Sequence, residues 1–130
     1  MRFVALVTVS LIGLAVYCAL SGVTTESRVK KHFGLSDVGS IEAMRAGLYE
    51  RLPIGSSESE VIGFLKRSGI GEDPLSYMAL ADDNGVIFAG VRHSRSDFGP
   101  LVRFDYGFNF KLDERGALTE IVIVRVGTGP

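Results

Sequence analysis

Residues 101–126 read LVRFDYGFNFKLDERGALTEIVIVRV, and this stretch predicts two long β-strands joined by a short turn. Before the turn, apolar residues alternate with polar residues or glycine, which is the pattern of a strand with one buried face. The residues on the apolar parity are Val102, Phe104, Tyr106, Phe108, Phe110 and Leu112. After the turn Asp113–Gly116, the segment Leu118–Val126 is rich in β-branched residues on both parities, so we expect it to be a central strand.

A first helix is predicted between the N-terminal region and this sheet. It begins at Ser36 or Asp37, because a short side-chain oxygen can accept hydrogen bonds from the unpaired amides of a helix start. It runs to about Arg51, and its apolar residues recur at helical spacing on one face.

A second helix is predicted over about Glu58–Ser68. Ser57 and Glu60 form a capping-box pattern at its start. Gly69 stands where a left-handed residue ends a helix.

Two further strands, Leu75–Ala81 and Val86–His93, are predicted to form a hairpin across the turn Asp82–Gly85, because its Asn-Gly pair is a strong turn signal. The order of elements is then helices first and strands afterwards, which favours segregated α+β architecture over alternating βαβ units. We therefore predict two N-terminal helices packed on a four-stranded antiparallel sheet.

Length and composition limit what this fold can do. The chain has 130 residues, a formal net charge of −1 and one cysteine, Cys18, in its apolar N-terminal run. A chain of this length is expected to form one small domain, which we place at residues 37–130. The net charge gives no reason to expect nucleic-acid binding. The two histidines, His32 and His93, have no carboxylate at ligand spacing, so we predict neither a metal nor a cofactor.

The N-terminal residues predict contact with a membrane. Phe3–Leu20 carries no charged residue and is long enough, as about 27 Å of helix, to approach the hydrocarbon thickness of a bilayer. Residues 1–21 are therefore a signal peptide or a membrane anchor, and the sequence leaves both open. Lipid attachment at Cys18 is disfavoured because Tyr17 precedes it. Residues 22–36 are polar and basic, and we interpret them as a linker.

This layout places the domain in the cell envelope. A soluble domain behind one N-terminal apolar segment is typically exported, which indicates a periplasmic location with possible anchoring to the inner membrane.

Two motifs resemble a known family. The segment Leu52–Val61 (LPIGSSESEV) and the later segment Phe108–Leu118 (FNFKLDERGAL) are similar to motifs of the SmpA/OmlA group, the small outer-membrane lipoproteins of the β-barrel assembly machine. That family's domain looks like that of β-lactamase inhibitor proteins. The resemblance implies a non-catalytic envelope protein that docks on a partner. The chain departs from the family at Tyr17, where lipidation needs a small residue, and at the stretched loop Gly71–Pro74.

The region 92–103 is the candidate ligand site. Four basic residues there could form a small anion-binding patch: Arg92, His93, Arg95 and Arg103. His93, Ser94 and Asp97 are also residue types used in nucleophilic catalysis, but neighbours in one loop rarely adopt triad geometry. We therefore expect no enzymatic activity from this loop.

The last strand carries the candidate partner surface. Ile121 and Ile123 lie on the parity opposite Leu118, so they would be uncovered if helices cover one sheet face only. The function favoured by the sequence is a protein-binding or scaffold module of the envelope with a protein or membrane-protein partner. The alternative is a small-ligand or anion binder that uses the 92–103 region.

Overall fold

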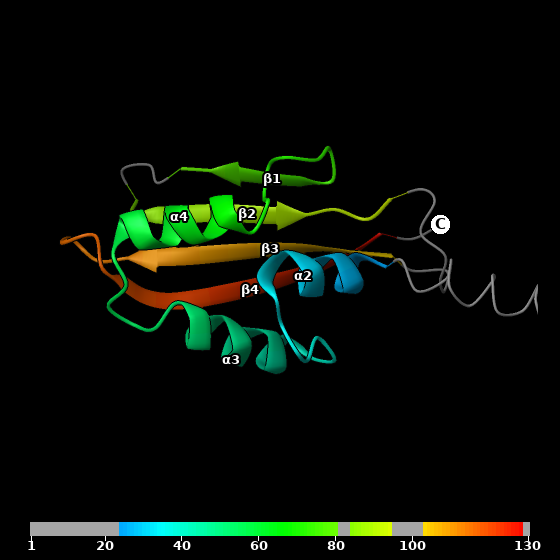
Figure 1. The fold of residues 1–130 in the computed structure, drawn as a ribbon, viewed down its shortest axis with the longest axis horizontal. Helices are drawn as coiled ribbons and strands as arrows, with labels where there is room; N and C mark the ends of the chain where they lie inside the picture. The colour runs from blue at the N-terminus through cyan, green and yellow to red at the C-terminus, as the bar shows by residue number, and fades with distance from the viewer. Residues whose placement is uncertain (1–23, 81–83, 95–102, 129–130) are drawn as a thin grey trace, which may run out of the picture.

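The computed structural model describes residues 24–80, 84–94 and 103–128, in which three helices pack against one antiparallel sheet (Figure 1). The helices are α2 (Thr25–Phe33), α3 (Ile41–Arg51) and α4 (Glu58–Arg67). The strands are β1 (Ser76–Ala79), β2 (Val86–Val91), β3 (Arg103–Leu112) and β4 (Leu118–Thr128). The α+β class and the four-stranded antiparallel sheet are therefore confirmed.

The strands lie in sequence order, β1-β2-β3-β4, and each pairs with the next. Strand β4 is consequently an edge strand, and the prediction that it is central was wrong. One face of β4 enters the core and the other faces outward, and both carry β-branched residues. Such a composition favours a strand but does not show whether the strand is paired on one side or on both.

A β-bulge near the start of β4 decides which of its residues are buried. Lys111 pairs with Glu120, but the next residue, Leu112, pairs with Leu118, so Thr119 is an extra residue in the ladder. One extra residue reverses the inside-outside parity of a strand. Leu118 on one side of the bulge and Ile121 on the other therefore both point into the core.

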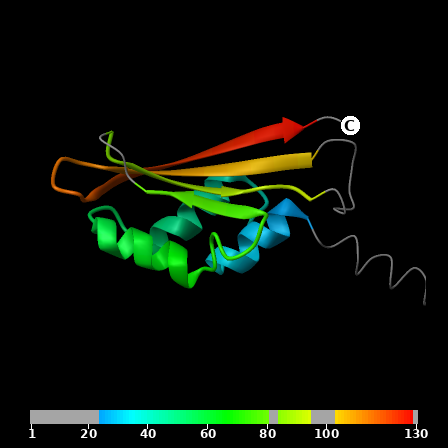
Figure 2. The same cartoon turned by 90° about the horizontal axis from the view of Figure 1, so that it is seen from above.

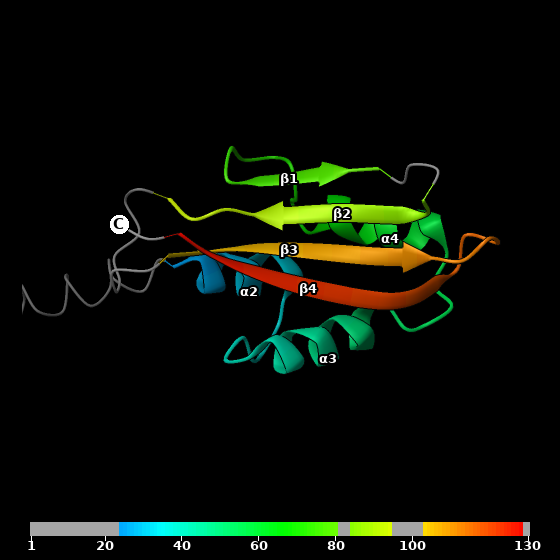
Figure 3. The same ribbon diagram turned by 180° about the vertical axis from the view of Figure 1, so that it is seen from behind.

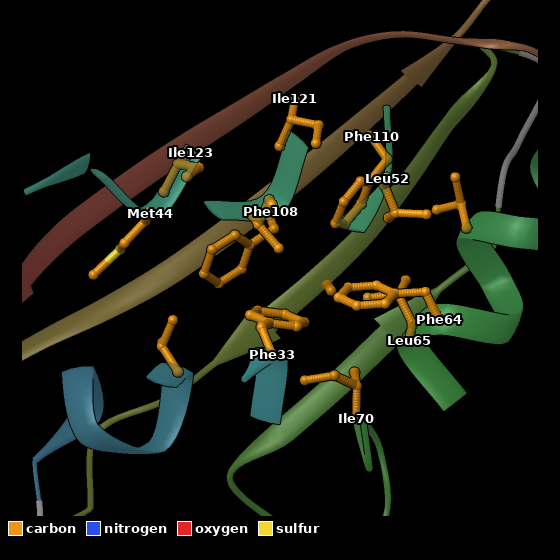
Figure 4. Packing of buried hydrophobic residues seen from close by; sticks show 14 of the residues in the cluster. Phe33, Met44, Leu52, Phe64, Leu65, Ile70, Phe108, Phe110, Ile121 and Ile123 are labelled. Carbon is orange, nitrogen blue, oxygen red and sulfur yellow. The ribbon is translucent and has the colours of Figure 1, made fainter. Parts of the chain in front are cut away.

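The predicted exposure of Ile121 and Ile123 was therefore wrong. Ile121 is fully buried and Ile123 is 6% exposed. Figure 4 shows both side chains in the packed layer between the sheet and the helices. The outward residues of β4 are the valines at positions 122, 124 and 126.

Residues 25–33 form a helix, so the interpretation of residues 22–36 as a linker was wrong. Thr24 and Ser27 make a reciprocal capping box at the start of α2, and Gly34 ends the helix at φ +65°. Val29 and Phe33 are buried, and they lie on one face because they are four residues apart. Helix α2 is thus part of the domain.

The other two helices follow the sequence patterns closely. Helix α3 starts later than predicted, because Ser40 rather than Ser36 or Asp37 accepts the capping hydrogen bond. Helix α4 begins after Ser57, whose hydroxyl accepts from the amide of Glu60 at 3.1 Å, as predicted.

Aromatic rings join the helices to the sheet (Figure 4). Phe33 of α2 stacks on Phe64 of α4, with 5.7 Å between ring centroids, and meets Phe108 of β3 edge-on at 5.0 Å. Burying each such side chain contributes about 1.5–3 kcal/mol before conformational entropy is subtracted. The predicted aromatic row of β3 is therefore confirmed as core.

No helix within residues 24–80, 84–94 and 103–128 is long and apolar enough to cross a membrane. The predicted signal or anchor, residues 1–21, lies outside the described residues.

Candidate partner-binding surface

The three helices of the described residues lie on one side of the sheet, and no helix or strand within residues 24–80, 84–94 and 103–128 covers its other side, here called the outer face (Figures 2 and 3). The ladder places one row of outward residues across all four strands: Tyr77 pairs with Gly90, Gly90 with Gly107, and Gly107 with Val124. A neighbouring row contains Phe88 and Val122 on either side of Asn109. The outer face is thus apolar at its centre.

Two glycines let aromatic rings lie flat on this face. A Cβ atom built on Gly90 would stand 2.3 Å from the Tyr77 ring, and one on Gly107 would stand 3.0 Å from the Phe88 ring. Both separations are shorter than normal carbon contacts. The rings of Tyr77 and Phe88 lie 5.5 Å apart. Glycine at these strand positions therefore positions the aromatic pair close to the backbone.

Next to these rings the surface is hollowed. A depression of about 310 Å³ is bordered by Tyr77, Phe88, Val124 and Val126, together with polar groups of Asp105 and Asn109. Val124 is 45% exposed and Val126 is 54% exposed, although both belong to a regular strand. Side chains of this kind are available to a binding partner.

Charged groups lie at the two ends of the outer face. At one end, the Arg92 guanidinium lies over the Tyr77 ring, 4.5 Å from its centroid. At the other end, Lys111 and Glu120 form an exposed ion pair at 3.7 Å. The face therefore has an apolar centre and a polar rim.

The predicted anion patch is only partly assembled. His93 is held by Asp105, whose Oδ1 lies 2.6 Å from Nδ1 of the ring and accepts from the His93 amide at 2.8 Å. Arg103 donates to the carbonyl of Ser94 at 3.4 Å, and Arg92 stacks on Tyr77. Arg95 lies outside the described residues. Because a carboxylate stands beside the imidazole, the site is less favourable for an anion than the sequence suggested.

The same contact changes the interpretation of the catalytic residue types. The carboxylate that reaches His93 is Asp105 of β3, not Asp97 of the loop, and Asp97 lies outside the described residues. Within residues 24–80, 84–94 and 103–128, no group of three His, Cys, Asp or Glu side chains could hold a metal ion.

Tyr106 ties the sheet to α2 near this end of the molecule. Its hydroxyl donates to Oε1 of Glu26 at 2.8 Å. Burial, followed by the hydrogen bond and the negative charge of Glu26, raises the pKa of Tyr106 to about 12. This contact orients α2 against β3.

Sequence reasoning missed the residues that form the outer face, namely Tyr77, Phe88, Gly90, Gly107, Val124 and Val126. The alternation in β2 and β3 did contain a signal, because glycines occur on the polar parity opposite the core. Placing Val124 and Val126 on the outer face required knowledge of the bulge at Thr119, which is seen only in the pairing of β3 with β4.

Comparisons of the chain with protein-family models, with curated proteins and with solved structures found no match.

Proposed function

We propose that this chain is a non-catalytic protein-binding module of the bacterial cell envelope, and that it binds a partner protein through the outer face of its sheet. The observation that carries the proposal is the uncovered apolar centre of that face, formed around Tyr77, Phe88 and Val124. An apolar area of this kind on a small domain is typical of an interaction site.

The composition of the face supports a protein partner over a small ligand. Protein interfaces are enriched in aromatic residues and arginine at an apolar centre, with a polar rim. Tyr77, Phe88 and Arg92 supply that combination here, and Arg92 is already stacked on the Tyr77 ring. Small-molecule sites, in contrast, are usually concave and enclose most of the ligand.

The envelope location rests on the apolar run Phe3–Leu20. We propose that this run exports the domain or anchors it to the inner membrane, which places the partner among periplasmic or membrane proteins. The short segment between Leu20 and the cap residue Thr24 then keeps the domain close to the membrane surface if the run is retained.

Site-specific photo-crosslinking of the full chain in its native host tests the proposal. A benzophenone amino acid replaces Tyr77 on the outer face or, as a control, Lys66 on the exposed side of α4. We expect the Tyr77 position to give an adduct with one envelope protein, identified by mass spectrometry, and the Lys66 position to give none.

A charge placed on the outer face provides the second arm. Val124→Asp should abolish the adduct from position 77 without lowering the unfolding temperature by more than a few degrees, because Val124 is 45% exposed and faces Gly107 on the neighbouring strand. Ser36→Asp adds the same charge in the loop between α2 and α3 and should leave the adduct unchanged. Equal adducts from positions 77 and 66, or an adduct that survives Val124→Asp, would overturn the proposal.

A further inference from the structure

The start of α2 lies at the end of the sheet where β2 and β4 finish and β3 begins (Figure 1). The amide of Arg28 donates to the carbonyl of the cap residue Thr24 at 3.1 Å, and its guanidinium donates to the carbonyl of Arg92 at 2.8 Å. Arg103 pairs with Thr128 at the same end of the ladder. We call this end the proximal end of the domain, because it is the end nearest in sequence to the apolar run Phe3–Leu20.

The proximal end carries more positive than negative formal charge. Its arginines are Arg28, Arg92, Arg103 and Arg125. Among the described residues of this end, the carboxylates are Glu26 and Asp105. Arg92 and Arg125 are exposed, and each lies over an aromatic ring, which does not neutralise its charge.

The opposite end of the domain, formed by the β3–β4 turn and the start of α4, has the reverse balance. Among its described residues, the carboxylates are Glu58, Glu60, Asp113, Glu114 and Glu120, and the cations are Lys111 and Arg115. The ten residues of β3 separate the two ends by roughly 30 Å. The charge of the domain is therefore polarised along the strands.

The link between the apolar run and the domain is short. Residues 21–23 separate Leu20 from Thr24, and a fully extended chain spans at most about 14 Å between them. The headgroup layer of one leaflet occupies about 5–7 Å of that length. With the run in a bilayer, Thr24 therefore lies within roughly 9 Å of the headgroup surface, which is about one Debye length at physiological ionic strength.

We propose that the proximal end rests on the anionic surface of the bilayer that holds the apolar run, with lipid phosphate groups facing its arginines. The inference rests on the anchoring described in the proposed function. A guanidinium fits the geometry of a phosphate group, and an anionic membrane attracts basic groups within a Debye length of it. The acidic opposite end is repelled by the same surface, so the strands run away from the membrane and the outer face stays accessible to a protein partner.

Fluorescence quenching in vesicles tests this orientation. The full chain, in a Cys18→Ser background, carries a fluorophore at Val126→Cys near the proximal end or, as a control, at Glu114→Cys in the β3–β4 turn. It is inserted through its apolar run into phosphatidylcholine vesicles, with or without one-third phosphatidylserine, that contain a lipid with a nitroxide on its headgroup.

Phosphatidylserine should raise the quenching at position 126 at least twofold and leave the quenching at position 114 unchanged. Molar sodium chloride should cancel the rise, because it shortens the Debye length to about 3 Å. These two responses use a chain with all its charged side chains at the proximal end, so they decide the proposal even if a charge variant fails to fold.

Matched charge variants identify the groups that contact the lipid. Arg92→Gln combined with Arg125→Gln removes two exposed charges from the proximal end, and Lys111→Gln combined with Arg115→Gln removes two from the opposite end. The first pair should remove at least half of the rise at position 126 and the second pair none of it. Circular dichroism checks that both variants fold.

Three results would overturn the proposal: quenching at position 126 that does not respond to phosphatidylserine, an equal rise at position 114, or an equal loss in the two charge variants. A chain that does not float with vesicles of either composition would overturn the anchoring as well, whereas a chain that floats without the rise overturns the surface contact alone. The vesicles contain no other protein, so none of these results reads out the partner bound by the outer face.

Discussion

The hydroxyl of Tyr106 donates a hydrogen bond to Glu26 across 80 residues of sequence, with 2.8 Å between the oxygens. This contact joins the first described helix to the third strand of the sheet. A second hydrogen bond, from Arg28 to the carbonyl of Arg92, is also 2.8 Å long. Two residues within one turn of α2 therefore attach it to β3 and to the residue that follows β2.

Tyr106→Phe should change how stability depends on pH. The pKa of Tyr106 is about 12 in the folded protein, against the ordinary tyrosine value of 10.0. Between these values the unfolded chain loses a proton that the folded protein keeps, so stability is fully present below pH 10 and falls as pH rises toward 12. We expect Tyr106→Phe to cost about 1 kcal/mol at pH 7. Urea unfolding at pH 9 and pH 11 should show that the free energy of unfolding falls less in the variant than in the parent. An equal fall in both proteins would contradict the raised pKa of Tyr106.

Phe33→Ala should destabilise the domain strongly, because Phe33 contacts both Phe64 and Phe108 and is 1% exposed. A cost of about 3–5 kcal/mol is typical for removing a buried phenylalanine. Lys31→Ala, on the exposed side of the same helix, should change stability by less than about 0.5 kcal/mol. Chemical denaturation of the two variants measures the difference. Equal stabilities would mean that α2 does not belong to the core.

Removal of the bulge residue tests its role in β4. Deleting Thr119 would make the ladder regular and force either Leu118 or the pair Ile121 and Ile123 out of the core. We expect loss of cooperative thermal unfolding in the deletion variant. Thr119→Ala removes only the side-chain bond to the carbonyl of Lys111 and should melt within a few degrees of the parent. A deletion variant that melts like the parent would show that the register can slip.

Paired truncations on β4 test the face assignment. Ile121→Ala should cost about 2–5 kcal/mol because Ile121 is fully buried. Val124→Ala should cost less than about 1 kcal/mol, since Val124 is already 45% exposed. The free energies of unfolding from urea titrations measure both. Reversed magnitudes would restore the parity that the sequence suggested.

The pattern of single elements could be predicted from the chain alone. The aromatic alternation of β3, the Ser57 cap of α4 and the turn at Asn84-Gly85 each depend on neighbours within a few residues. The structure shows the Ser57 cap of α4, the alternating burial of β3 and the antiparallel pairing of β1 with β2, whereas residues 81–83 of the predicted turn lie outside the described residues.

Helix α2 was missed although its core contacts leave a faint local signal. Val29 and Phe33 are four residues apart, but basic and polar residues surround them and match a linker equally well. Whether such a segment folds depends on the sheet against which it packs, because a short helix gains most of its stability from tertiary contacts.

The outer face depends on information that local patterns do not carry. Both parities of β4 are apolar, so the pattern allowed either set of residues to be buried. The bulge at Thr119 selects Ile121 and Ile123 for the core and turns the valines outward.

The amino-acid sequence by itself determined the α+β class, the order of strands along the chain, the core of β3 and the apolar run at the N-terminus. The tertiary structure alone decided that β4 is an edge, that α2 joins the core and which face remains open. The physical reason is that periodicity reports whether a residue has a buried side, whereas lateral pairing and helix coverage depend on contacts between residues far apart in sequence.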